Sequence, residues 1–203
     1  MPYGHLRYWL LPLLRRRARV VGAEHLPAEG GFLVAPNHNA WIDTPLLAGV
    51  LYQSVREKLY FISRSIHYGV LGAISIDPSH PSGVIDVSLD YLNRGNPVIV
   101  YPEGRSNPRR ELRPPKTGLA RLAHLSGRPV IPVGIRGTFG ITAPVSLVCF
   151  LLWFHRVAVH IGPPLVFERL SPNAISRDRL DETSDRIMRA IAALSGKPFS
   201  PDV

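Results

Sequence analysis

A histidine and an aspartate stand five positions apart in the segment 37–43, NHNAWID. A turn of this length can fold the carboxylate of Asp43 back onto one ring nitrogen of His38 and leave the other nitrogen free. A histidine held in this way can act as a general base toward a hydroxyl. The alternative is that Asp43 caps a helix and that His38 is an ordinary loop residue.

The flanking residues predict a strand before this pair and a helix after it. The apolar run 31–36 is expected to be a buried strand. Thr44 is the predicted N-cap of a helix whose first residue is Pro45. The His–Asp pair therefore lies between a strand end and a helix start.

A second polar cluster follows another apolar segment. Residues 97–101 are expected to form a buried strand, and Glu103, Gly104 and Arg105 come directly after it. In open α/β sheets, ligands bind outside the carboxyl ends of the strands. The two clusters are therefore predicted to meet at one edge of a sheet and to form a single site.

In order and spacing, these motifs resemble those of the lysophospholipid and 1-acylglycerol-3-phosphate acyltransferase family. That family carries Asn-His-x4-Asp, then a strand ending in Pro-Glu-Gly, then a lysine-bearing element and a Val-Ile-Pro-Val strand. The resemblance covers about residues 20–167. The matching segments of this chain are 37–43, 101–104, 114–118 and 129–134.

The resemblance implies a glycerol-3-phosphate acyltransferase-like fold and an O-acyltransferase of phospholipid biosynthesis. Such an enzyme moves a fatty acyl group from acyl-CoA or acyl carrier protein to the hydroxyl of a lysophospholipid such as 1-acylglycerol 3-phosphate. His38 would take the hydroxyl proton, and Asp43 would fix its tautomer and stabilise the imidazolium. Another lipid acceptor, a lyso-aminolipid or a glycolipid, remains an alternative.

By the same resemblance, Glu103, Gly104 and Arg105 belong to the acceptor site. Lys116 is expected there from the same loop, and Arg64 from the end of a neighbouring strand. Two of these residues depart from the family pattern. Arg105 follows Gly104 directly, where the family has threonine and then arginine, and Arg64 stands where the family has lysine. The identity of the acceptor head group therefore stays open.

Direct attack by the acceptor hydroxyl is expected, without a covalent acyl-enzyme and without a metal. No serine or cysteine of the sequence lies in a Gly-x-Ser-x-Gly elbow. No third ligand stands at metal-like spacing from His38 and Asp43. The thioester is a co-substrate, and no other cofactor is predicted.

The chain is strongly basic, with a formal net charge of +9 over 203 residues. Its hydrophobic content of 45% is sufficient for one compact domain with a core. The charge suits anionic lipid, phosphate-bearing substrates, an acidic carrier protein or nucleic acid. A basic nucleic-acid-binding module is therefore the alternative from another class. The sequence lacks zinc-ligand spacing, a helix-turn-helix pattern and interleaved aromatic and basic residues, which argues against that alternative.

The first 19 residues are expected to form a membrane-interface segment ahead of an acyltransferase domain that spans 20–203. The stretch 6–14 is apolar, and arginines follow it at positions 15, 16, 17 and 19. This pattern is typical of an interfacial anchor or of a terminal helix packed on the domain. The apolar run 143–154 is too short to span a bilayer, and is either a core element or a membrane-dipping or acyl-chain-lining segment. We expect a peripheral protein at the cytoplasmic face of the cell membrane.

Strand and helix patterns alternate along the chain, which predicts a single α/β domain with a mostly parallel mixed sheet flanked by helices. Strands are expected at 31–36, 58–62, 74–76, 97–101, 129–135 and 157–161. Helices are expected at 45–55, 66–71, 84–92, 118–125 and 178–194.

Overall fold

The computed structural model describes residues 12–13, 15–52, 59–63, 73–76, 79, 83–138 and 157–200. The predicted helix at 66–71, Arg64 and the apolar run 143–154 lie outside these residues, as does most of the stretch 6–14. None of the helices in the described part of the chain combines the length and apolar character that a membrane span requires.

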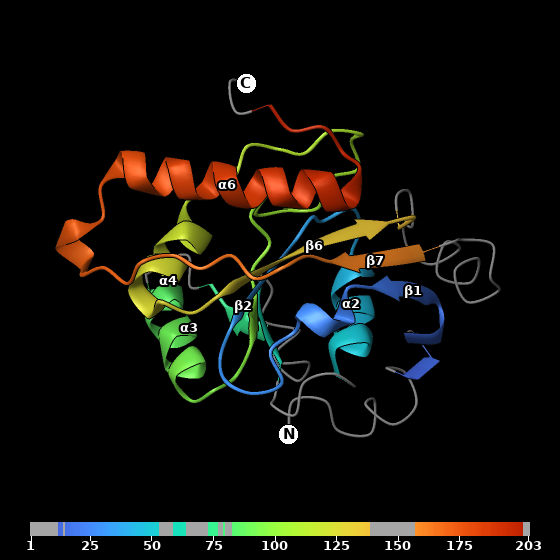
Figure 1. The fold of residues 1–203 in the computed structure, drawn as a ribbon, viewed down its shortest axis with the longest axis horizontal. Helices are drawn as coiled ribbons and strands as arrows, with labels where there is room; N and C mark the ends of the chain where they lie inside the picture. The colour runs from blue at the N-terminus through green and yellow to red at the C-terminus, as the bar shows by residue number, and fades with distance from the viewer. Residues whose placement is uncertain are drawn as a thin grey trace.

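Seven strands form one sheet in the order β1-β7-β6-β2-β5-β3-β4 (Figure 1). All neighbouring pairs are parallel except β6 and β7, which are antiparallel. The prediction of a mostly parallel mixed sheet is therefore confirmed. The strands are β1 (Ala18–Val21), β2 (Leu33–Pro36), β3 (Tyr60–Ser63), β4 (Ala73–Ser75), β5 (Val98–Ile99), β6 (Val130–Arg136) and β7 (Val157–Ile161).

The edge strand β1 was not among the predicted strands. It pairs in parallel with β7, with Ala18 opposite Val157 and Val21 opposite His160. The strand overlaps the arginine-rich segment, since Arg19 is one of its four residues, and this obscured the short apolar pattern. Because β1 begins at Ala18, the boundary expected at residue 19 falls inside a strand of the sheet.

Helices α3 (Gly83–Asn93), α4 (Gly118–Ser126) and α6 (Arg177–Ser195) match their predicted bounds within one residue. Helix α2 (Asp43–Tyr52) begins earlier than predicted, at Asp43. Thr44 therefore lies inside the helix and is not its N-cap, so that prediction is wrong. The reason is that the main-chain N–H of Asp43 already donates to the carbonyl of Ala40 at 3.1 Å, which starts the helical turn before Thr44.

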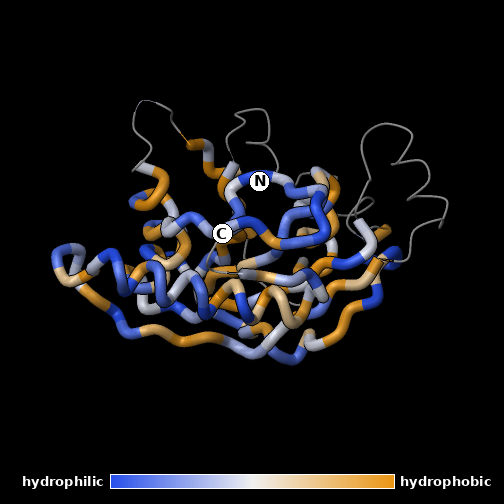
Figure 2. The backbone as a smooth tube through the Cα atoms, turned by 90° about the horizontal axis from the view of Figure 1, so that it is seen from above, coloured by the Kyte–Doolittle hydropathy of each residue, from blue (hydrophilic) through white to orange (hydrophobic). Residues whose placement is uncertain are grey.

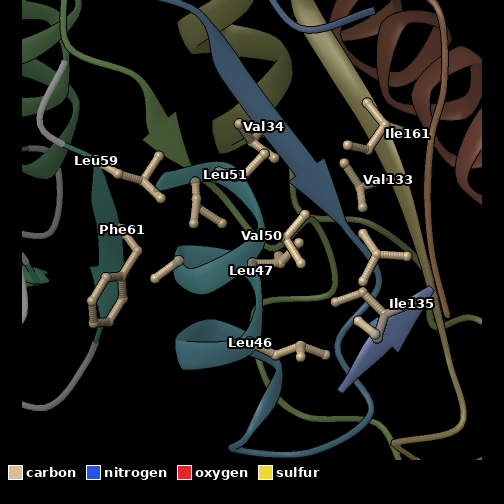
Figure 3. Close-up of a cluster of buried hydrophobic side chains, with 14 of the residues drawn as sticks. Val34, Leu46, Leu47, Val50, Leu51, Leu59, Phe61, Val133, Ile135 and Ile161 are labelled. Atoms are coloured by element: carbon tan, nitrogen blue, oxygen red, sulfur yellow. The ribbon is translucent and has the colours of Figure 1, made fainter. Parts of the chain in front are cut away.

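Alternate residues of the central strands face opposite sides of the sheet. Val34 of β2 and Ile99 of β5 point to the side of α2, whereas Leu33 and Val98 point to the other side. On the α2 side, Leu46 and its helical neighbours pack against residues from several strands (Figure 3). That cluster includes Leu46, Leu47, Val50 and Leu51 of α2, with Val34, Leu59, Phe61, Val133, Ile135 and Ile161.

The other face of the sheet is covered by α3, α4 and α6 (Figure 1). Their buried residues include Leu92, Leu119, Leu122, Ile187, Met188 and Ile191. Apolar and polar residues interleave along α6, and this alternation can be followed along the backbone tube in Figure 2. A sheet covered on both faces explains why its strands appear in the sequence as continuous apolar runs.

The C-terminal end of α6 packs directly on the backbone of β6. A Cβ atom on Gly134 would lie 2.2 Å from the carbonyl carbon of Leu194 and 2.4 Å from the nitrogen of Ser195. Nearby, the Nε of Arg136 donates to the carbonyl of Leu194 at 2.8 Å. Only glycine at position 134 allows this close approach of helix and strand.

We expect Gly134→Ala to lower the free energy of unfolding by about 1–3 kcal/mol, because backbone must move to admit the methyl group. Urea denaturation of the purified variant measures this change. Gly83→Ala is the matched control, since no atom lies within 4 Å of its added Cβ, and it should leave stability unchanged or raise it by about 0.4–1 kcal/mol. Equal stability of the two variants would contradict the proposed close packing of α6 on β6.

Candidate active site

His38 and Asp43 meet at the carboxyl end of β2, as the sequence predicted. His38 follows that strand, and Asp43 is the first residue of α2. The Nδ1 of His38 lies 3.0 Å from the Oδ2 of Asp43. The pairing sets the tautomer, since a proton on Nδ1 donates to the carboxylate and leaves Nε2 with a free lone pair. His38 keeps 17% of its side-chain surface exposed, so a hydroxyl can reach it.

The Asp43 carboxylate is wholly buried and is compensated by main-chain donors. Its Oδ2 accepts hydrogen bonds from the N–H groups of Asn39, at 2.6 Å, and Ala40, at 2.8 Å. Its position at the N-terminus of α2 also favours a negative charge. Its Oδ1 has no hydrogen-bond partner among the described residues. The buried charge therefore acts mainly through Oδ2, toward the imidazole of His38.

Tyr101 is part of the site, although the sequence pointed to it only as the end of a strand. Its ring stacks on the imidazole of His38, with 4.1 Å between centroids and 27° between planes. Its hydroxyl lies 2.8 Å from the Oγ1 of Thr44. Burial raises the pKa of Tyr101 well above its usual value and the negative charge of Asp43 raises it further, against a smaller opposite effect of Thr44. Tyr101 is therefore a neutral platform that holds the ring of His38.

Glu103 faces the protein and joins the two loops of the site. Its side chain is buried, with 3% exposed. Oε1 accepts the main-chain N–H of His38 at 3.0 Å, and Oε2 accepts the N–H of Arg113 at 3.1 Å and the side-chain amide of Asn107. The sequence placed Glu103 in the acceptor site. In the structure its oxygens contact protein donors and fix the backbone of His38.

Asn107 supports the same junction and was not singled out from the sequence. It is fully buried, and its main-chain N–H donates to the carbonyl of His38 at 2.6 Å. Its side-chain Nδ2 also donates to the carbonyl of Glu111 at 2.7 Å, and its Oδ1 accepts from the N–H of Arg109 at 3.1 Å. Both main-chain polar groups of His38 are thus bonded to the loop that follows β5.

Two further asparagines tie the histidine turn to β6. The side chain of Asn37 accepts from the N–H of Ile135 at 2.6 Å and donates to its carbonyl at 3.0 Å. The Nδ2 of Asn39 donates to the same carbonyl at 3.1 Å and to Oγ1 of Thr138 at 3.0 Å. The sequence does place an asparagine on each side of His38, directly after an apolar strand. This pattern could have indicated that the turn is attached to the sheet through side-chain amides.

Lys116 and Arg105, two of the cationic residues predicted for the acceptor, lie in the loop after β5. Gly104 has a φ of 70°, and a Cβ there would lie 2.8 Å from Cδ and Cε of Lys116. The stem of Lys116 therefore crosses the glycine, and its main-chain N–H donates to the carbonyl of Pro102 at 2.9 Å. Lys116 and Arg105 are both exposed. Arg64 lies outside the described residues.

Within the described ranges, no three His, Cys, Asp or Glu side chains gather in a way that could hold a metal ion. The side chains of the site are themselves suited to removing a proton from a hydroxyl group. A fixed imidazole with a free Nε2 can remove a proton from a hydroxyl, and exposed cations nearby can hold an anionic group of the same molecule.

Comparison with known proteins gives matches to acyltransferases. A family model described as Acyltransferase matches residues 17–136. The 1-acyl-sn-glycerol-3-phosphate acyltransferase of Bacillus subtilis is 28% identical over 131 residues, which cover 61% of this chain and 65% of that protein. The human 1-acyl-sn-glycerol-3-phosphate acyltransferase alpha is 28% identical over 138 residues, 64% of this chain and 47% of that protein. The chain thus spans about half to two thirds of the length of these relatives.

A solved structure shares the fold over nearly the whole chain. It is the crystal structure of the 1-acyl-sn-glycerophosphate (LPA) acyltransferase, PlsC, from Thermotoga maritima. The TM-score is 0.62 at 22% sequence identity, and the match covers 96% of this chain and 83% of the other. The predicted fold class is therefore confirmed.

We expect Glu103→Gln to destabilise the protein, because an amide NH2 must then face at least one of three N–H donors. A buried donor left without an acceptor costs about 1–3 kcal/mol. Urea denaturation checks the change. Glu111→Gln is the matched control in the same loop, since the Glu111 side chain is exposed, and it should change stability by less than about 0.5 kcal/mol. Similar effects of the two substitutions would show that the contacts of Glu103 carry little of the stability.

Proposed function

The chain belongs to the acyltransferase family, and from this premise we propose that it acylates the free hydroxyl of a lysophospholipid such as 1-acylglycerol 3-phosphate. The donor in this proposal is the thioester of acyl-CoA or acyl carrier protein, and the product is a phospholipid precursor. The observation that carries the proposal is the His38–Asp43 pair, with Nδ1 bound at 3.0 Å and Nε2 without a hydrogen-bond partner among the described residues. The acceptor class is taken from its relatives, which are 1-acyl-sn-glycerol-3-phosphate acyltransferases.

The proposed reaction uses the tautomer of His38 that the contact between Nδ1 and Asp43 sets. The Nε2 of His38 takes the proton of the acceptor hydroxyl as its oxygen attacks the carbonyl carbon of the thioester. The carbon–sulfur bond then breaks, an ester bond remains, and the imidazolium returns its proton to the leaving thiolate. Between these steps the positive imidazolium is stabilised by the Asp43 carboxylate and by the face of the Tyr101 ring.

The phosphate of the acceptor is assigned to Lys116 and Arg105. Both are exposed beside the loop that holds the backbone of His38, and charge-assisted hydrogen bonds to phosphate are among the stronger polar contacts. Arg105 stands one position nearer to Gly104 than in the family pattern, and a long flexible side chain can still reach the same anion.

We place the reaction at the surface of an anionic membrane, to which the protein attaches peripherally. The net charge of +9 supports this assignment, since each basic residue near an anionic leaflet contributes about 1 kcal/mol of attraction. The exposed side chains of Leu13 and Arg16 fit the same role for the N-terminal segment. An assay of the protein therefore presents the acceptor in vesicles that contain anionic lipid.

In such an assay, we expect wild-type protein to transfer labelled acyl groups from acyl-CoA or acyl carrier protein to one or more members of a panel of lyso-lipids. Products are identified by mass. His38→Ala should lower turnover by about 10²–10⁴-fold, because general-base catalysis is lost. His160→Ala, on β7, is the control histidine and should retain activity. Near-normal turnover by folded His38→Ala protein would exclude the mechanism. A preference for a lyso-aminolipid or a glycolipid would change the acceptor and leave the chemistry unchanged.

Lys116→Met tests the assignment of the phosphate. We expect the Michaelis constant for a phosphate-bearing acceptor to rise by about ten-fold or more, because a charge-assisted bond of about 1.5–3 kcal/mol is lost. The constant for the thioester and the turnover number should change little. Arg110→Met removes an equal charge from an exposed position of the same loop and is the control. Equal increases for donor and acceptor would assign the loop to the thioester carrier instead.

A further inference from the structure

The segment after α6 returns to the loop that holds His38. Helix α6 ends at Ser195 and is capped by Gly196, which has a φ of 72° and whose N–H donates to the carbonyl of Ala192. The carbonyl of Pro198 then accepts the N–H of Leu112 at 2.9 Å. Phe199 packs against the buried cluster on this face of the sheet. The last described residues are therefore anchored on both sides of Lys197.

Lys197 contacts this loop with its side chain. Its Nζ donates to the main-chain carbonyl of Asn107 at 3.2 Å. The N–H of the same residue, Asn107, donates to the carbonyl of His38 at 2.6 Å. Two hydrogen bonds, both made by the main chain of Asn107, thus connect Lys197 to the backbone of His38, the proposed base.

The ammonium group of Lys197 is influenced by its burial and by the buried carboxylates of the site. Burial lowers the pKa of Lys197, while the carboxylates of Glu103 and Asp43 act in the opposite direction. Lys197 is therefore within electrostatic reach of both buried carboxylates of the site. Arg136 also lies near this segment, and its Nε is bonded to the carbonyl of Leu194.

We propose that Lys197 is a positioning residue for the reaction, which holds the carbonyl of Asn107 and through it the backbone of His38. This inference rests on the proposed function for its kinetic consequence. It assigns a role to a residue well beyond position 136, where the match to the family model ends. It also explains why a lysine is kept half-buried next to a loop that already carries exposed arginines.

Two substitutions of Lys197 in the full chain separate positioning from substrate binding. Lys197→Met keeps the length of the stem and removes the donor, so turnover should fall by about ten-fold or more as the base is displaced. Both Michaelis constants should stay within about two-fold, since uniform binding is untouched. Lys197→Arg restores a donor and should recover most of the turnover. Arg189→Met, on the exposed side of α6, removes an equal charge and should have no such effect.

Amide hydrogen exchange gives a second measurement that needs no substrate. In Lys197→Met, segments 37–43 and 103–113 should exchange faster than in wild type, and in Lys197→Arg and Arg189→Met they should not. Unchanged exchange in Lys197→Met overturns the proposal, whether or not the protein transfers acyl groups. A selective rise in the acceptor Michaelis constant also overturns it, in favour of direct contact with the phosphate. If the wild type transfers no acyl group but the exchange pattern is as expected, only the proposed function is refuted. The contact of Lys197 with Asn107 would then still be shown to hold the turn that carries His38.

Discussion

The buried carboxylate of Asp43 is the constraint on which the rest of the site depends. A negative charge without exposed surface is costly unless nearby groups stabilise it. The chain provides two main-chain N–H donors, the N-terminus of α2 and the Nδ1 proton of His38. These same contacts fix the turn between β2 and α2 and orient the imidazole. The contacts that stabilise the charge of Asp43 are therefore the same contacts that orient the imidazole of His38.

A second buried carboxylate, that of Glu103, joins this turn to the loop after β5. It accepts the N–H of His38 with one oxygen and donors from Asn107 and Arg113 with the other. Asn37 and Asn39 connect the turn to β6 on the opposite side. The turn that carries His38 is thus attached to the loop after β5 on one side and to β6 on the other. The cations that could hold an acceptor stay at the outer side of this framework, where solvent reaches them.

The sequence was sufficient for those features that depend on local spacing. The His38–Asp43 contact joins residues five positions apart, and the strand and helix patterns carried their own periodicity, so both were predictable. The direction of the Glu103 side chain was not, because its donors come from His38 and Arg113, which approach only in the folded sheet. The stacking of Tyr101 on His38 and the bond of Lys197 to Asn107 also join residues far apart in the sequence, so neither was predictable. The early start of α2 was missed because Asp43 and the turn before it, not Thr44, determine where the helix begins.

The two main-chain bonds of His38 have a consequence for how the protein responds to heat. Its N–H and carbonyl are both bonded to the 103–113 loop and not to a neighbouring strand, so the turn and the loop form a cooperative unit that opens together. Such a unit lies outside the regular ladder of the sheet and can open while β2, β5 and β6 remain paired. Activity can therefore be lost on heating at temperatures where spectroscopic signals of the sheet still report an intact protein. We therefore expect any loss of activity on heating to follow the local opening of this loop before global unfolding.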